Sequence, residues 1–366
     1  MDEPRAGAPA PGESARRRRR RRWRKRRRHH GGARRAANGT PIYAALDLGT
    51  NNCRLLVAQP TADGFRVVDS FSRIVRLGEG VSGSGKLSET AMERAIGALR
   101  VCAGKLRERR MAGLRLIATE ACRAAANGAD FLARVRRATG LALEIVDRGT
   151  EARLAARGCA SLLDPEAAGA ILFDIGGGSS ELAWLERADA VDRGPPNAAV
   201  RAWISLPFGV VTLAERHGGE RVSREIFDSM VDEAVPRVAE FAICAGTNGM
   251  QGLHLLGTSG TVTTIAGVHL GLRRYDRRRV DGLWLCARDV SEVVDRLVHT
   301  SYEERVANPC IGVERADLVL AGCALLEAIR RVFPCDRLRV ADRGLREGML
   351  IELMRADGVW AGSPVS

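Results

Sequence analysis

The hydrophobic pattern of residues 41–161 switches repeatedly between the period of a strand and that of a helix. It predicts strands near 42–47, 53–59 and 65–77, a helix over 88–110, a strand at 114–118, helical sequence to about 138 with a break near 127–128, a strand at 143–146 and a helix over 151–161. Ser88 is the expected N-cap of the helix over 88–110, whose apolar stripe runs from Met92 to Leu106. The predicted order is therefore βββαβαβα.

Residues 170–355 repeat this order. Their pattern predicts strands at 170–174, 181–185, 200–206, 253–256 and 337–341 and helices near 210–217, 223–244, 261–269, 288–299, 314–332 and 345–355. Two copies of one order indicate an α/β fold of two similar domains with a cleft between them. We expect the first domain at 40–160 and the second at 161–366, with 186–199 as an exposed connection within the second.

Each copy opens with an apolar run that ends in Asp and a glycine-containing loop. Residues 43–57 read YAALDLGTNNCRLLV and residues 170–185 read AILFDIGGGSSELAWL, which places Asp47 and Asp174 at equivalent positions. A carboxylate at a strand end, beside a loop of bare backbone N–H groups, suits a metal and a phosphate together. Two such loops facing each other across a cleft indicate a long or multiply phosphorylated substrate.

The two loops differ in how strongly they indicate an anion site. The first consists of Gly49, Thr50, Asn51 and Asn52, which are also residues typical of a β-hairpin turn. The second consists of Gly176, Gly177, Gly178 and Ser179, and three consecutive glycines carry an entropy cost that a plain turn does not require. A backbone nest for an anion does require them. Asp174 and Glu181 flank this second loop and could hold Mg²⁺ through oxygen or water.

Three further segments invite a functional interpretation. Arg123 follows a predicted strand end and could clamp phosphoryl oxygens, although an ion pair with a surface carboxylate is the plain alternative. Glu151 begins a helix. Its charge there either stabilises the helix through the helix dipole or serves as a general base at the mouth of the cleft. Residues 80–87 match the spacing of a nucleotide-binding loop, but Leu87 stands where Ser or Thr would bind Mg²⁺, so we expect an ordinary loop.

The charge of the chain is concentrated in one terminal segment. The formal net charge is +13, but residues 1–37 hold fourteen Arg and one Lys against three carboxylates, so the remaining 329 residues carry only +1. We expect residues 1–39 to be a disordered tail, because like charges repel and no apolar periodicity is present. Residues 16–28 could bind a polyanion through counterion release. The alternatives are a solvated extension and an upstream start codon.

Composition limits the cellular location, the metal sites and the binding surfaces that the chain can be expected to have. Nine Cys without a CxxC pair, in a long chain without a secretory segment, indicate reduced thiols and a cytoplasmic location. No uninterrupted apolar run is long enough for a membrane span. The six His are scattered, which argues against a zinc site. Aromatic residues make up only 4%, which argues against a surface dominated by base stacking.

The chain resembles the exopolyphosphatase and guanosine pentaphosphate phosphohydrolase (Ppx/GppA) family, which has the actin-like fold. The resemblance rests on ALDLGTNNCRLLV, ATEACRAAANG, EIVDRGTEARLAARG, LFDIGGGSSELAW, LLGTSGTVTTIAG and ERADLVLAG, which occur in the family's order over about residues 41–350. Three departures are Thr150, where the family commonly has a second acidic residue, Asn52, where it commonly has Ser, and the lack of the C-terminal helical domain of longer members.

The resemblance implies a role for each candidate residue. Glu151 falls at the catalytic base for water and Arg123 at a phosphate-contacting arginine. Asp174 and Glu181 fall at acidic, Mg²⁺-associated positions, and we add Asp47 as the equivalent of Asp174. The two loops fall at the family's phosphate loops. A homodimer is an expectation from the family alone.

Three functions follow as hypotheses. The first is a Mg²⁺-dependent hydrolase that releases terminal phosphate from inorganic polyphosphate, guanosine pentaphosphate or both. The second is a nucleotide-binding kinase or ATPase of the same superfamily. The third is a non-catalytic polyphosphate or nucleic-acid binder that acts through the basic tail.

Overall fold

The structure is a computed structural model that describes residues 39–188, 194–247 and 249–361. The chain divides into two units, residues 1–40 and 41–366, and the second unit contains both sheets. The predicted tail, including its basic run at 16–28, and the centre of the predicted connection at 186–199 lie outside the described residues. None of the described helices combines the length and hydrophobicity that a membrane span requires.

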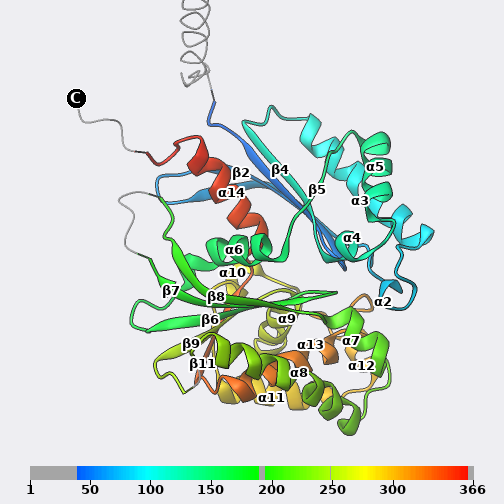
Figure 1. Ribbon diagram of the computed structural model, residues 1–366, viewed down its shortest axis with the longest axis vertical. Helices are drawn as coiled ribbons and strands as arrows, with labels where there is room; N and C mark the ends of the chain where they lie inside the picture. The colour runs from blue at the N-terminus through cyan, green and yellow to red at the C-terminus, as the bar shows by residue number, and fades with distance from the viewer. Residues whose placement is uncertain (1–38, 189–193, 248, 362–366) are drawn as a thin grey trace, which may run out of the picture. The chain divides into compact units, whose positions relative to one another are not determined.

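The first sheet has the strand order β3-β2-β1-β4-β5 (Figure 1). Its strands are β1 (Tyr43–Leu48), β2 (Asn52–Pro60), β3 (Phe65–Ile74), β4 (Gly113–Ala118) and β5 (Glu144–Ile145). The first three are antiparallel neighbours, whereas β4 and β5 run parallel to β1. The helices of this half are α2 (Val81–Ser84), α3 (Glu89–Arg107), α4 (Glu120–Ala124), α5 (Gly128–Thr139) and α6 (Arg148–Cys159).

The second sheet repeats this arrangement with one additional strand. Its order is β10-β11-β9-β6-β7-β8, so that β8-β7-β6-β9-β11 corresponds to the whole first sheet. The strands are β6 (Gly169–Ile175), β7 (Ser180–Arg187), β8 (Ala198–Leu206), β9 (Leu253–Thr258), β10 (Trp284–Cys286) and β11 (Arg337–Ala341). The predicted α/β fold with two βββαβαβα copies is confirmed, and β10 is the strand that the pattern did not predict.

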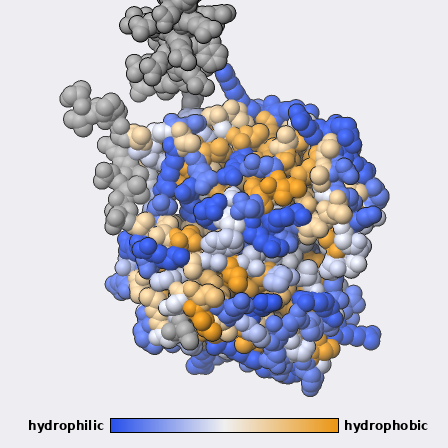
Figure 2. All heavy atoms as spheres, in the orientation of Figure 1, coloured by the Kyte–Doolittle hydropathy of each residue, from blue (hydrophilic) through white to orange (hydrophobic). Residues whose placement is uncertain are grey.

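The helices of the second half lie largely on one side of its sheet (Figure 1). They are α7 (Val210–His217), α8 (Arg224–Cys244), α9 (Gly260–His269), α10 (Arg277–Val280), α11 (Ala287–Val298), α12 (Tyr302–Ala307), α13 (Val319–Val332) and α14 (Leu345–Ala356). The predicted helix over 314–332 begins only at Val319, because Arg315 and Asp317 belong to turns that precede it. Hydrophilic residues cover most of the face seen in Figure 2, interrupted by small groups of hydrophobic ones.

Local sequence explains where the predicted elements begin. Ser88 accepts a hydrogen bond from the backbone N–H of Ala91 at 3.2 Å and thus caps α3, as predicted. Residues 81–84 form a single helical turn between Gly80 and Gly85, which both have positive φ, so the expected loop contains a short helix. Helix α6 begins at Arg148 and not at 151, because Asp147 is its N-cap.

Two helices separate the sheets. The buried side chains of α14 pack with residues of β1, β2 and β4, whereas those of α6 pack mainly with β6, β7 and β9. The hydroxyl of Tyr43 donates to Asp357 just beyond α14 at 2.9 Å. Thus the C-terminal helix completes the core of the first sheet. The domain boundaries at 160 and 161 stay a prediction.

Candidate active site

A cavity of about 840 Å³ lies between the two halves, with residues of both sheets on its walls. Twelve of the thirteen predicted site residues line it: Asp47, Gly49, Thr50, Asn51, Asn52, Glu151, Asp174, Gly176, Gly177, Gly178, Ser179 and Glu181. The thirteenth, Arg123, lies behind Glu151. Residues that are more than a hundred positions apart therefore meet at one site.

The two glycine loops have the same backbone closure. The N–H of Gly49 donates to the carbonyl of Asn52 at 2.8 Å, and the N–H of Gly176 donates to the carbonyl of Ser179 at 3.0 Å. Each loop joins the first strand of its sheet to the second, antiparallel strand. The repeat seen in the sequence is therefore a repeat of local structure.

The loops also lie against each other. A Cβ atom on Gly177 would stand 3.0 Å from Cβ of Thr50 and 3.2 Å from the backbone nitrogen of Asn51. A Cβ atom on Gly178 would stand 2.9 Å from Oγ1 of Thr50. Hence part of the reason for three consecutive glycines is close packing between the loops, which a single-loop interpretation does not include.

Strand register identifies a cation that the sequence interpretation missed. In the first hairpin Asp47 pairs with Arg54, and in the second Asp174 pairs with Glu181. Arg54 therefore occupies in one repeat the place that Glu181 occupies in the other. The signal was available in the sequence, because both residues lie seven positions after their Asp.

Three carboxylates of the cavity, those of Asp47, Asp174 and Glu181, have raised pKa values. Burial raises the pKa of Asp174 to about 6, against the opposing effect of Arg54. Burial and then the charge of Asp174 raise the pKa of Glu181 to about 7, although the hydroxyls of Ser179 and Ser205 each donate to it at 2.8 Å. Burial also raises the pKa of Asp47. Carboxylates with strongly shifted pKa values are typical of catalytic and binding sites.

Glu151 is buried at the end of the first turn of α6. Asp147 caps this turn by accepting from the N–H of Thr150 at 2.8 Å and from its hydroxyl at 2.7 Å. Burial and then the charge of Glu181 raise the pKa of Glu151 to about 8, and Arg123 opposes them. The Nη1 group of Arg123 donates to Glu151 and, at 2.6 Å, to the carbonyl of Val146. In this structure Arg123 contacts Glu151 and does not face the open cavity.

Arginines from distant parts of the chain line the cavity as well. Besides Arg54 they are Arg73, Arg277, Arg315, Arg343 and Arg346. Within the described ranges Arg54 and Arg346 make no hydrogen bond or ion pair with another residue, and Arg315 reaches only Thr264, at 3.4 Å. Burial lowers the pKa of both Arg315 and Arg346. Arg54, Arg315 and Arg346 therefore have neither a carboxylate nor an aromatic partner within the described part of the chain, and such cations suit a polyanionic ligand.

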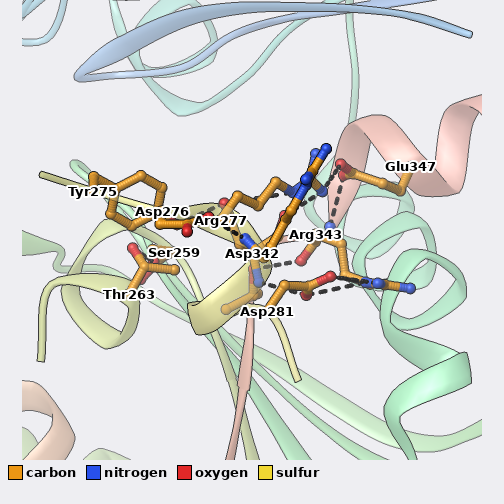
Figure 3. A network of polar contacts seen from close by, with 12 residues as sticks. Ser259, Thr263, Tyr275, Asp276, Arg277, Asp281, Asp342, Arg343 and Glu347 are labelled. Atoms are coloured by element: carbon orange, nitrogen blue, oxygen red, sulfur yellow. Dashed lines mark hydrogen bonds and ion pairs between the residues drawn. The ribbon is translucent and has the colours of Figure 1, made fainter. Parts of the chain in front are cut away.

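Of the other arginines, Arg73 lies over the ring of Phe71 at 5.2 Å from the ring centroid. Arg277 and Arg343 belong to a network that stiffens one wall (Figure 3). Arg277 donates to the Asp342 carbonyl at 2.5 Å and to Glu347 at 3.0 Å, and Tyr275 donates to the Asp342 carboxylate at 2.6 Å. Arg343 forms a bidentate ion pair with Asp281. These charges are balanced within the protein, so they form a scaffold around the three unpaired arginines.

Buried polar atoms of the two loops could serve as ligands of a metal ion. The Oδ1 atoms of Asp47 and Asn52 are buried and have no hydrogen-bond partner, and Asp174 pairs with Glu181 across the neighbouring hairpin. However, no group of three or more Asp, Glu, His or Cys residues in the described part of the chain is close enough to form a ready-made metal site. Mg²⁺ nevertheless suits these few carboxylates, because it commonly binds one or two of them and completes its coordination shell with water and substrate phosphates.

The fold is similar to those of several solved structures. A crystal structure of the Ppx/GppA member from Aquifex aeolicus is 28% identical, with a TM-score of 0.72, and the match covers 89% of this chain and 100% of that one. For an exopolyphosphatase-like protein these values are 30%, 0.74, 87% and 99%. An exopolyphosphatase from Cytophaga hutchinsonii, with 24% identity, a TM-score of 0.75 and coverage of 88% and 100%, shows the fold alone. The model of the Ppx/GppA phosphatase family matches residues 56–357, and the chain therefore belongs to that family of phosphatases.

Proposed function

We propose that this phosphatase is a Mg²⁺-dependent hydrolase that releases the terminal phosphate of inorganic polyphosphate, guanosine pentaphosphate or both. The observation that carries the proposal is the meeting of Glu151, both glycine loops and three unpaired arginines on the walls of one cavity. A neutral substrate would leave these cations without partners, whereas a chain of phosphates supplies several negative charges in a row.

In this mechanism Glu151 orients a water molecule and accepts its proton during in-line attack on the terminal phosphorus. Arg123 supports the step because it donates to Glu151 and stabilises its ionised form. Little covalent chemistry is required of the protein, so positioning and charge stabilisation supply most of the rate. Direct contact between Arg123 and phosphate remains part of the proposal implied by the family.

The loops and arginines hold the substrate. Backbone N–H groups around Gly49 and Gly176–Gly178 would cradle phosphate oxygens, with Thr50 and Ser179 as additional donors. Arg54, Arg315 and Arg346 would balance the charge of further phosphates along the cavity. The kinase or ATPase alternative uses the same fold, but no observation on these residues favours it over hydrolysis.

Asp47, Asp174 and Glu181 are the candidates to hold Mg²⁺. The three are not close enough to form a complete site in the described structure, so one or two of them would bind the ion while water and substrate phosphates complete its shell. When bound there, the ion would neutralise charge on phosphate oxygens. The raised pKa values of these carboxylates support this role, because a bound cation would favour their ionised forms. Chelation of divalent ions should therefore abolish turnover, and added Mg²⁺ should restore it.

The deciding experiment measures free phosphate from polyphosphate and from guanosine pentaphosphate with the wild type and with Glu151→Gln. The variant should lose turnover by a factor on the order of 10²–10⁴ and still bind polyphosphate. Turnover like that of the wild type would refute the assignment of Glu151. Formation of a phosphorylated acceptor without free phosphate would favour the kinase alternative. Deletion of residues 1–38 should leave hydrolysis unchanged, whereas loss of all binding would favour the tail-driven binder.

A further inference from the structure

Four side chains of alternating charge join the wall of the cavity, which Glu151 and Glu120 both line, to an outer pocket that Arg148 borders. We call them the charge ladder, and they are Glu151, Arg123, Glu120 and Arg148. Arg123 contacts Glu151 at the inner end, and its Nε donates to Glu120 at 3.1 Å. Arg148 closes the outer end through two contacts with Glu120, at 2.9 Å from Nη2 and at 3.3 Å from Nε.

The ladder is built from two helices that present opposite orders of charge. Helix α4 carries Glu120 and Arg123, and the first turn of α6 carries Arg148 and Glu151, each pair three residues apart. Residues at this spacing lie on one face of a helix. As a result each acid meets the base of the other helix, and the contacts tie α4 to the turn that bears Glu151.

Glu120 and Glu151 compete for one guanidinium. Arg123 bonds to both carboxylates, and the Val146 carbonyl holds it in place at 2.6 Å. Arg148 supplies Glu120 with a second cation, so Glu120 does not depend on Arg123 for charge balance. Without Arg148, the whole negative charge of Glu120 would draw on Arg123 and weaken its contact with Glu151.

We propose that Arg148 and Glu120 are positioning residues that hold Arg123, and through it the carboxylate of Glu151, in the orientation needed to activate water. This inference rests on the proposed role of Glu151. The other charges that face Glu151 come from β7 and β1, through Glu181 and Asp47, and both are negative. Arg123 is therefore the cation on which the orientation of Glu151 depends, and the ladder is what holds Arg123.

Arg148 is the most exposed of the four side chains and is therefore the suitable one to change. Its side chain is 43% exposed, whereas those of Glu120 and Glu151 are 13% and 10% exposed. It borders a shallow outer pocket that Trp203 also lines. Shortening Arg148 therefore leaves no cavity in the core, and a loss of turnover cannot be ascribed to unfolding.

The first arm of the test measures kcat and KM with polyphosphate. Arg148→Gln should lower kcat about tenfold and leave KM unchanged, since loss of a supporting partner commonly costs about 10–100-fold. Arg148→Lys should recover most of kcat, because it keeps a cation beside Glu120. The matched control is Arg153→Gln, which changes an exposed arginine on the same helix. Among the described residues the Arg153 side chain hydrogen-bonds only to Thr150, so the variant should behave as the wild type. Equal kcat in Arg148→Gln and the wild type, or equal losses in Arg148→Gln and Arg153→Gln, would overturn the proposal.

The second arm does not depend on turnover. A crystal structure of Arg148→Gln should show Arg123 moved toward Glu120 and its contact with Glu151 lost. An unchanged contact would overturn the positioning role. If the wild type releases no phosphate from either substrate, the proposed function fails, and the crystal structure still decides whether Arg148 holds the ladder.

Discussion

Gly348 of α14 lies so close to Leu154 of α6 that a Cβ atom on it would stand 2.0 Å from the Leu154 carbonyl oxygen. The relation is reciprocal, because a Cβ atom on Gly158 of α6 would stand 2.0 Å from the carbonyl oxygen of Gly344. The two helices thus cross backbone to backbone between the sheets. Since α6 carries Glu151 and α14 carries Arg346, this crossing sets the distance between opposite walls of the cavity.

Replacing Gly348 by Ala should therefore destabilise the protein. Backbone must move to admit the methyl group, so we expect a loss of about 3 kcal/mol in the free energy of unfolding, at the upper end for overpacking. Unfolding in denaturant measures this loss of stability. The control is Gly97→Ala in α3, where nothing lies within 4 Å of the added Cβ. There Ala should stabilise the helix by about 0.5–1 kcal/mol, and similar effects of both substitutions would contradict the proposed crossing.

Glu181→Gln should stabilise the protein in alkaline solution. The folded state raises the pKa of Glu181 from 4.5 to about 7, so this group's favourable contribution exists below pH 4.5 and is lost as pH rises through 7. Gln carries no charge and can still accept from Ser179 and Ser205. We expect a gain of about 2 kcal/mol at pH 8 and little difference at pH 5, measured by thermal unfolding.

The control for this prediction is Glu186→Gln, a charge change near the end of the same strand, where Glu186 pairs with Arg201. It should have a small effect at both pH values, because exposed ion pairs contribute little. A Glu181→Gln variant that is less stable than the wild type at pH 8 would argue that burial does not penalise this carboxylate.

The rate of hydrolysis should depend on the ionisation of Glu151. Burial and the charge of Glu181 raise its pKa to about 8 in the metal-free protein, and bound Mg²⁺ would lower this pKa by offsetting that charge. A base must be ionised to accept a proton, so kcat/KM should rise with pH and level at or below about pH 8. Glu181 contributes to this shift, so Glu181→Gln should move the rise to lower pH. The measurement is phosphate release between pH 5.5 and 9.5, roughly 2 units either side of the expected limb. A rate independent of pH over this range would contradict the assignment of the base.

Arg54→Gln should weaken substrate binding more than folding. Arg54 makes no hydrogen bond or ion pair in the described structure and acts on Asp47 and Asp174 only through its charge, so its removal should affect folding less than substrate binding. A hydrogen bond to a charged group contributes about 1.5–3 kcal/mol, so KM for polyphosphate should rise about 10–100-fold. Arg73→Gln, which changes another arginine of the same wall, tests whether the effect follows position or only total charge. An unchanged KM in Arg54→Gln would remove Arg54 from the proposed phosphate path.

Local patterns predicted the repeat and the order of its elements along the chain, because each strand and each glycine loop is encoded within a few residues. Asp47 and Asp174 could be paired from sequence since both end the first strand of a repeat. Arg54 could have been found in the same way, as the residue that matches Glu181. Both residues of this match lie on the second strand of their hairpin.

Contacts between distant segments could not be predicted in this way. The pattern gave no reason to place Arg346 beside Asp47, because that requires α14 to return to the first sheet. The ladder is a second case, since it requires α4 and the first turn of α6 to lie side by side. Arg123 was expected to face phosphate, and only tertiary packing shows that it bonds to Glu120 and Glu151.

The two halves are also joined outside the cavity walls. Arg76, after β3, forms a bidentate ion pair with Asp317, before α13, at 2.8 and 2.9 Å, and Glu215 of α7 accepts from the N–H of Gly80 at 2.8 Å. Any widening of the cleft at this place must separate charged groups and not merely apolar surfaces. Salt weakens partly exposed ion pairs, so ionic strength should influence how readily a bulky substrate enters and how quickly its product departs.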